Sequence, residues 1–419
     1  MEYSIPNELS KVKQLKDEGK FTEALQIANE LEKRDNLSLQ EQYNCHHLKG
    51  SLLFEQGYMD DALKYAERAY KSAQQLKEEL QIIDAILIKA KIFRYSDKFT
   101  KAFDTISEAE QILKTFDDYS KVEFKEKNAY ILHLKSQIYM DTGDLNLALK
   151  YGEESLQLAR ELNNKRLIID NNGTIGVIYH YKGENDTYLK YNRKRLKLAK
   201  ELNDKQNIIG GLNNIGLALL DKGDFNQAKN YLKQSLELCE EINSFKTPII
   251  LESYCQLAIE TDSIETAQEC LDYVKRFDTP RYKENLLGYG DNLKNLIEAR
   301  VLKLSPKVSD KIRARELFKK ELEKPVFDSK IMALLNLCDS FLLELYETNN
   351  IKILDDITNY IQQILDFAKE KKSYKLLAEA YLFQAKLKLI TFEFEETQQL
   401  LKQALHISEK YGYELLARQ

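Results

Sequence analysis

Cysteine and histidine side chains could form a metal or catalytic site in this sequence, and their spacing decides against one. The five cysteines are odd in number and include no CxxC pair or other spacing suited to zinc. His46 and His47 are adjacent, so they project in different directions from one helix, and no HExxH motif accompanies them. We therefore expect no metal or other cofactor, and reduced, buried cysteines. These are Cys45, Cys239, Cys255, Cys270 and Cys338.

Carboxylates are abundant, but no acid–base pair stands out among them. EFEET at 393–397 and KDEGK at 16–20 are typical of solvated helix faces or turns. LLGYGDN at 286–292 contains a GxG, yet it lies in a helical pattern with no strand before it and no Gly-Lys-Ser/Thr after it. Because no catalytic constellation is found, we expect a protein that is not an enzyme.

The charge balance argues against nucleic acid and membrane as partners. Lys and Arg number 62 against 67 Asp and Glu, a net charge of −5, so no general attraction to polyanions is expected. The basic stretch KYNRKRLKLAK at 190–200 is short and reads as one solvated helix face. No apolar signal segment or stretch long enough to span a membrane is present in the sequence. We expect a cytoplasmic protein without membrane insertion.

Any binding residues would be positioned by a repeat of about 40 residues, whose copies begin near His47, Leu87, His133, Gly173 and Asn213. Each copy has a helix with a small residue, a turn that often contains glycine, and a second helix with another small residue. Helix axes that cross at about 8–10 Å need small side chains at the crossing point. The small residues of the first helices are Gly50, Ala90, Ser136, Gly176 and Gly216, and those of the second are Ala62, Ala102, Ala148 and Ala228.

This pattern resembles the tetratricopeptide repeat (TPR) across residues 8–243. The long period is similar to that of kinesin light chain, of the adaptors Pins and LGN, and of the Rap-type peptide receptors. The resemblance implies an all-α, right-handed TPR solenoid of about ten antiparallel helix pairs. We expect residues 1–243 to form a regular array of about six repeats, and residues 244–419 to continue it with divergent TPR-like pairs.

In such an array the first helix of each pair lines the concave groove, and its residues three, four and seven apart share one face. That face mixes polar residues with Leu, Met and Val, which favours a binding surface. Asn213-Asn214 matches the Asn-Asn/Asn-Leu-Gly motif with which the adaptors named above hold a peptide, and an Asn side chain can both donate to and accept from a peptide backbone. The groove residues we predict to contact a partner are His47, Lys91, Arg94, His133, Gln137, Thr174, His180, Asn213, Asn214 and Leu217.

Arg195 is a further candidate, because it occupies a position where the neighbouring repeats have Ala or Ser. Two interpretations are open. In the first, Tyr188 and the stem of Arg195 fill space left by Gly173 and Gly176. In the second, the guanidinium reaches the groove and meets an acidic group of a ligand.

The predicted function is that of a protein-interaction adaptor that binds a peptide segment of a partner in the groove. An intracellular peptide receptor is the alternative; it would need an N-terminal effector module, whereas LKDEGKFTEALQIANELE at 15–32 already enters a repeat. Self-association through the array ends is a third hypothesis, because YELLARQ at 413–419 begins another amphipathic helix. His133 and His180 predict binding that depends on pH between about 6 and 7.

Overall fold

The computed structural model describes residues 5–34, 36–116, 121–242, 244, 246–261, 263–276, 289–305, 307–323 and 327–418. Within these ranges all regular structure is helical, which confirms the predicted all-α class. Part of the GxG stretch, residues 286–288, lies outside the described residues.

The helices of the described ranges follow one another as ten antiparallel pairs, in agreement with the predicted number of about ten. The pairs are α1 (Ile5–Asp17) with α2 (Phe21–Glu32), α3 (Leu39–Glu55) with α4 (Met59–Leu76), α5 (Glu79–Tyr95) with α6 (Phe99–Leu113), α7 (Val122–Asp141) with α8 (Leu145–Glu161), α9 (Lys165–Lys182) with α10 (Asn185–Glu201), α11 (Lys205–Asp221) with α12 (Phe225–Glu241), α13 (Thr247–Glu260) with α14 (Ile264–Arg276), α16 (Tyr289–Lys303) with α17 (Val308–Leu322), α18 (Phe327–Thr348) with α19 (Leu354–Lys371), and α20 (Tyr374–Ile390) with α21 (Phe394–Tyr411). A short 3-10 helix, η1 (Ile351–Ile353), precedes α19, and α22 (Glu414–Arg418) follows the last pair. The predicted boundary at 243/244 stays a prediction, since helix pairs continue on both sides of it.

Small residues bring the two helices of a pair together, as the sequence predicts. A Cβ atom added to Gly216 would lie 2.7 Å from Cγ of Leu232 in α12, so the α11–α12 crossing leaves no room for a side chain. Ser136 in α7 fits because its hydroxyl donates to the carbonyl of Ala148, at 2.7 Å. The predicted crossing alanines are also fully buried, namely Ala62, Ala90, Ala102, Ala148 and Ala228.

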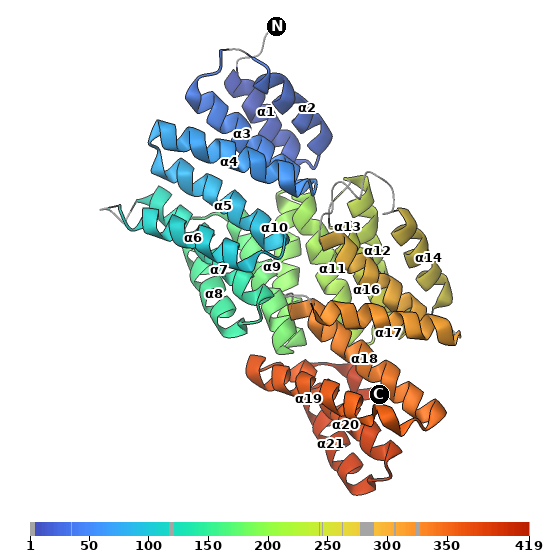
Figure 1. Cartoon of the computed structure of the whole chain (residues 1–419). Coiled ribbons are helices and arrows are strands. Elements are labelled where there is room, and N and C mark those ends of the chain that lie inside the picture. Colours follow the sequence, from blue (N-terminus) through green and yellow to red (C-terminus); the bar gives the residue numbers. More distant parts are fainter. Residues whose placement is uncertain are drawn as a thin grey trace.

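The solenoid coils so tightly that helix pairs five apart along the chain touch (Figure 1). A Cβ atom on Gly19, between α1 and α2, would lie 3.2 Å from Cγ2 of Ile242 at the end of α12. Likewise Asn185, at the start of α10, donates from Nδ2 to the carbonyl of Gly412, at 3.1 Å. Repeats in a solenoid are related by a small constant rotation, so about five pairs complete one turn here.

The cysteines are all free and buried, which confirms that part of the sequence interpretation. Over the described ranges, no group of three or more His, Cys, Asp or Glu side chains could hold a metal ion. The helices that the structure describes include none with the length and apolar character needed to cross a membrane.

Candidate functional site

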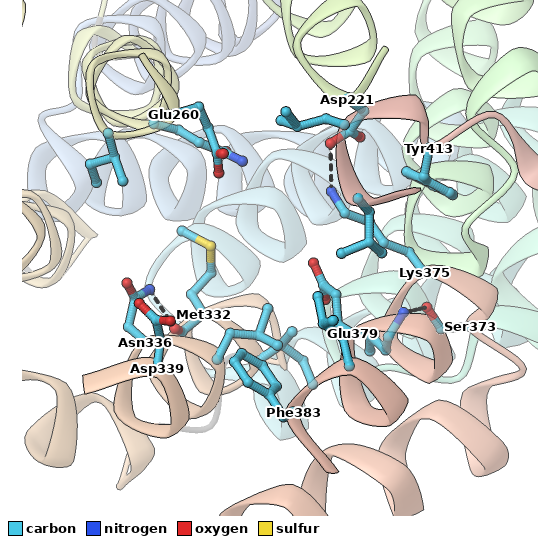
Figure 2. A pocket seen from close by; sticks show the side chains of 18 of the residues that line it. Asp221, Glu260, Met332, Asn336, Asp339, Ser373, Lys375, Glu379, Phe383 and Tyr413 are labelled. Carbon is cyan, nitrogen blue, oxygen red and sulfur yellow. Dashed lines mark hydrogen bonds and ion pairs between the residues drawn. The ribbon is translucent and has the colours of Figure 1, made fainter. Parts of the chain in front are cut away.

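A cavity of about 330 Å³ opens on the inner surface of the last superhelical turn, and we call it the C-terminal cavity (Figure 2). Its walls come from the first helix of successive pairs, α9, α11, α13, α16, α18 and α20, together with α22. In this turn the first helices therefore line the interior, as predicted. Its lining residues include His180, Asp221, Glu260, Arg300, Lys303, Met332, Leu335, Asp339, Lys375, Glu379, Phe383 and Tyr413.

One face of α20 supplies both charged and apolar lining residues. Lys375, Glu379 and Phe383 are four residues apart, so their side chains project from the same side of the helix into the cavity. Ser373 begins the helix, and its hydroxyl accepts a hydrogen bond from the amide of Leu376, at 3.4 Å. The wall is thus amphipathic, with carboxylate and ammonium groups set beside an aromatic ring.

Two ion pairs hold helices of the wall together. Lys375 Nζ lies 2.8 Å from Oδ1 of Asp221, and Lys303 Nζ lies 2.5 Å from Oδ2 of Asp339. Burial acts against the charge of Lys375, but the carboxylates of Asp221, Glu379 and Glu260 together outweigh it and raise the pKa of the ammonium group. Burial likewise acts against the charge of Asp339, and Lys303 outweighs it and lowers the pKa of that carboxyl. These pairs neutralise both lysines locally.

Arg300 is neutralised from behind the cavity wall. The Arg300 guanidinium, on α16, forms an ion pair with Glu252 on α13. The Arg300 side chain is itself buried, and its Nε atom has no hydrogen-bond partner within the described part of the chain.

Two carboxylates of the cavity form no ion pair among the described residues, although Lys375 is near enough to oppose the rise in the pKa of both. Glu379 projects from α20 and Glu260 from α13, and Figure 2 shows their carboxylates directed toward the same open space. Burial raises the pKa of Glu379 to about 7, an effect that Asp221 and Glu260 strengthen and Lys375 opposes. Burial also raises the pKa of Glu260. These two groups are the least satisfied charges of the wall.

Further polar atoms at the cavity lack hydrogen bonds. Asp221 and Tyr413 are 7% and 1% exposed, yet Oδ2 of Asp221 and the Tyr413 hydroxyl have no hydrogen-bond partner among the residues that the structure describes. Nδ1 of His180 lies 4.0 Å from that Asp221 oxygen. Buried polar groups are normally hydrogen-bonded, and each exception calls for a cause. A polar ligand in the cavity would supply the missing partners.

Of the predicted site residues, His180 lines this cavity, beside Asp221. The His180 ring lies 4.8 Å from that of Tyr188, between ring centroids. Burial lowers the pKa of His180 to about 4, and it does the same for His133. These lowered pKa values argue against a response of either imidazole between pH 6 and 7, and pH-dependent binding stays a prediction.

The predicted residues nearer the N-terminus lie on the inner helices but contact one another. Arg94 donates to both carboxylate oxygens of Asp141, at 2.5 and 3.2 Å, and Gln137 donates to the Thr174 hydroxyl at 3.4 Å. His133 shares a hydrogen bond of 3.0 Å with Asn171. That these residues contact a ligand stays a prediction. The same holds for three others that are partly buried, His47, Lys91 and Leu217.

The asparagine pair of α11 takes part in a buried polar cluster. Asn214 donates from Nδ2 to Oδ1 of Asn192 in α10, at 3.0 Å. Asn213 makes a longer contact of 3.4 Å to Asn214, and its own Oδ1 has no hydrogen-bond partner among the described residues. Asn213 is therefore the member of the pair with an acceptor still available, and a ligand contact by either residue stays a prediction.

Arg195 fills space beside Gly173, as one interpretation predicts, but with its guanidinium rather than its stem. A Cβ atom on Gly173 would lie 2.9 Å from Cζ of Arg195, so the guanidinium occupies the space that this glycine leaves. Gly176 faces Asn192 rather than Arg195. The guanidinium donates to Oδ1 of Asn207, at 3.0 and 2.7 Å. A ligand contact for Arg195 also stays a prediction.

Comparisons with known proteins agree with this architecture. Family models described as tetratricopeptide repeat match residues 43–76 and 129–162, and another matches residues 210–248. No curated protein matches the chain. Similarity to solved structures is confined to the fold, since sequence identities are about 15%.

Three solved structures illustrate this fold. A Rap protein complexed with competence and sporulation factor aligns with a TM-score of 0.62 and 15% identity, over 88% of this chain and 98% of that one. NprR in complex with its cognate peptide NprX aligns with a TM-score of 0.54 and 16% identity, over 88% and 100% of the chains. The apo form of the quorum sensor NprR from B. thuringiensis aligns with a TM-score of 0.51 and 15% identity, over 87% of this chain and 98% of that one. The chain is therefore an all-helical solenoid that carries tetratricopeptide repeats.

Proposed function

We propose that this protein is a receptor for a short peptide, which binds in the C-terminal cavity. The observation that carries the proposal is the amphipathic inner wall of this cavity, in which Oε2 of Glu379 and the Tyr413 hydroxyl are buried and have no hydrogen-bond partner among the described residues. A peptide offers both donors and acceptors along its backbone, together with side chains for the apolar wall near Met332 and Phe383.

The size of the cavity favours a short ligand over an extended partner segment. A volume of about 330 Å³ falls at the lower end of the range of about 300–1,000 Å³ for small-ligand sites. The contact between Asn185 and Gly412 joins two superhelical turns next to the lining residue Tyr413. The adaptor hypothesis, with a ligand running through the whole groove, is the alternative.

Solved structures of the same fold support a peptide ligand. NprR was solved with its cognate peptide NprX, and its chain aligns over its full length with this one. The binding role requires no reaction, and we propose no catalytic activity and no cofactor.

A cavity-blocking variant tests the proposal. Leu335→Trp places an indole at the wall, whereas Leu343→Trp puts the same side chain on an exposed position of the same helix, α18. Wild type and Leu343→Trp should capture the same subset of a randomised heptapeptide pool, as identified by mass spectrometry. Leu335→Trp should capture at least tenfold less while its circular dichroism spectrum is unchanged.

Two results would contradict the proposal. If the wild-type protein captures no peptide above background, the chain is not a peptide receptor of this kind. If folded Leu335→Trp captures as much as the control variant, the ligand binds elsewhere on the array and the adaptor alternative is favoured.

A further inference from the structure

The charges around the C-terminal cavity are unequally paired. Lys375, Lys303 and Arg300 each have a carboxylate partner, in Asp221, Asp339 and Glu252 respectively. A fourth cation of the wall, Lys386, lies over the Phe383 ring, with Nζ 5.8 Å from the centroid, and helps to lower the pKa of Asp339. Two wall carboxylates, those of Glu260 and Glu379, form no ion pair among the described residues, and Oε2 of Glu379 has no hydrogen bond at all there. A buried carboxylate is stable only when it is paired or hydrogen-bonded.

The unpaired carboxylates converge although they come from separate parts of the array. Glu260 ends α13 and Glu379 belongs to α20, and both point into the same space in Figure 2. Tyr413, whose hydroxyl has no hydrogen-bond partner among the described residues, and Asp221, whose Oδ2 lies 4.0 Å from Nδ1 of His180, line the same cavity, and both residues are more than nine-tenths buried. The cavity therefore presents several hydrogen-bond acceptors to one region.

We propose that this region is a subsite for a basic side chain of the bound peptide, whose guanidinium or ammonium group lies between the carboxylates of Glu260 and Glu379. The inference rests on the proposed function, since it names the chemistry of the peptide. An arginine side chain carries five donors in a planar arrangement and can serve two carboxylates at once. The Asp221 Oδ2 atom and the Tyr413 hydroxyl accept the remaining donors.

A metal ion is a poorer occupant than an organic cation. Within the described residues no three His, Cys, Asp or Glu side chains are arranged to hold one. The wall also contains Met332 and Phe383, which suit the aliphatic stem of a lysine or arginine. Carboxylate and apolar surface together match a basic side chain.

The test compares four heptapeptide pools with blocked termini and no charged residue except at the centre, which is fixed as Arg, Lys, Met or Glu. Hydrogen bonds to charged groups are strong enough that the Arg and Lys pools should bind roughly tenfold or more tightly than the Met pool. The Glu pool should bind most weakly. Argininamide, the free cation, should not bind at the concentrations at which the Arg pool saturates.

Matched variants assign the preference to the two carboxylates. Glu260→Gln and Glu379→Gln keep the size of each side chain, and each should reduce the preference for Arg over Met at least fivefold. Glu395→Gln, on the exposed face of α21, makes the same charge change and should leave the preference unaltered. Circular dichroism and melting temperature check that each variant is folded.

The outcomes separate this inference from the proposed function. The basic subsite is refuted, while peptide binding stands, if the Met pool binds wild type as tightly as the Arg pool. The same follows if a Glu260→Gln/Glu379→Gln double variant keeps the full preference for Arg over Met. If argininamide binds as tightly as the Arg pool, the site binds a free cation, and the proposal that the cation belongs to a peptide is wrong. If no pool binds, both proposals fail.

Discussion

Lys375 donates a hydrogen bond of 2.8 Å to Oδ1 of Asp221, although 154 residues separate the two in the chain. The bond joins α20 to α11, and the backbone of Lys375 also packs against Gly183 at the end of α9. The wall of the C-terminal cavity is therefore made by one superhelical turn meeting the next. Its integrity depends on contacts between distant repeats as well as on those within each pair.

We expect Lys375→Met and Asp221→Asn each to lower the free energy of unfolding by about 1–3 kcal/mol, because each change leaves a partly buried group without its partner. The two side chains are only 19% and 9% exposed, so solvent compensates little. A double-mutant cycle by urea unfolding should give a coupling energy of about 1–3 kcal/mol. Additive effects of the two substitutions would show that the contact does not hold the turns together.

Gly183→Ala should loosen the C-terminal pair specifically. Gly183 has a φ of 78°, and a Cβ atom there would lie 2.2 Å from the backbone nitrogen of Lys375. Gly143→Ala is a matched control, because Gly143 has a φ of 84° in the equivalent turn of the preceding pair. Both changes should cost about 1 kcal/mol for the left-handed backbone. Only Gly183→Ala should also increase hydrogen exchange in α20 and α22 and weaken peptide capture; equal exchange in the two variants would contradict this.

The helix pairs could be predicted from sequence because each depends on local rules. Gly216 faces Leu232 and Ser136 faces Ala148, and both contacts recur with the period of the repeat. The cavity could not be predicted in this way. It depends on Asn185 meeting Gly412 over 227 residues, a contact set by small rotations that accumulate from pair to pair.

The charged residues of the cavity were missed for a related reason. Glu260, Arg300 and Glu379 lie in the divergent half, where the repeat is too weak to align the groove positions of its helices with those of the regular half. A signal does exist, because Lys375 and Glu379 are the only charged residues in the first half of the helix YKLLAEAYLFQAKLKLI and are four residues apart. Among the residues named from sequence, His180 came closest, because its position in the regular half could be aligned.

Asn214→Ala should lower stability, contrary to the simple picture of a groove asparagine that serves only a ligand. The change removes the donor to Oδ1 of Asn192, a residue with no exposed surface, and a buried acceptor left without a partner costs about 1–3 kcal/mol. Asn213→Ala is the paired comparison and should cost less than 1 kcal/mol, since its one contact is 3.4 Å long. Melting curves of the two variants measure these costs. Equal losses of stability would contradict the structural role assigned to Asn214.

Self-association through an array end can be tested at the last pair. Phe392 and Phe394 are 77% and 63% exposed at the start of α21, and their ring centroids are 6.2 Å apart. If this end mediates association, light scattering should show a mass that rises with concentration in wild type and stays monomeric in Phe392→Ser/Phe394→Ser. The same mass in both proteins at all concentrations would remove this surface from consideration.

Glu379 should make stability depend on pH. Its pKa in the folded protein is about 7, above the ordinary value of 4.5, so the folded state holds its proton to higher pH than the unfolded chain does. The carboxyl therefore begins to destabilise the fold as pH rises above about 4.5, and the cost is complete above about 7. Lys375 opposes this cost from the same helix, while Asp221 on α11 and Glu260 on α13 increase it.

Glu379→Gln should consequently be more stable than wild type at pH 8, by roughly 1–3 kcal/mol after allowance for partial solvent access, and equal to it near pH 4.5. Urea unfolding at pH 8, 6 and 4.5 measures the difference, with the exposed Glu395→Gln as control. The Arg-centred peptides should bind wild type more weakly as pH falls below about 7, because protonation removes the charge that they meet. A stability difference that stays constant over this range would show that Glu379 does not titrate there.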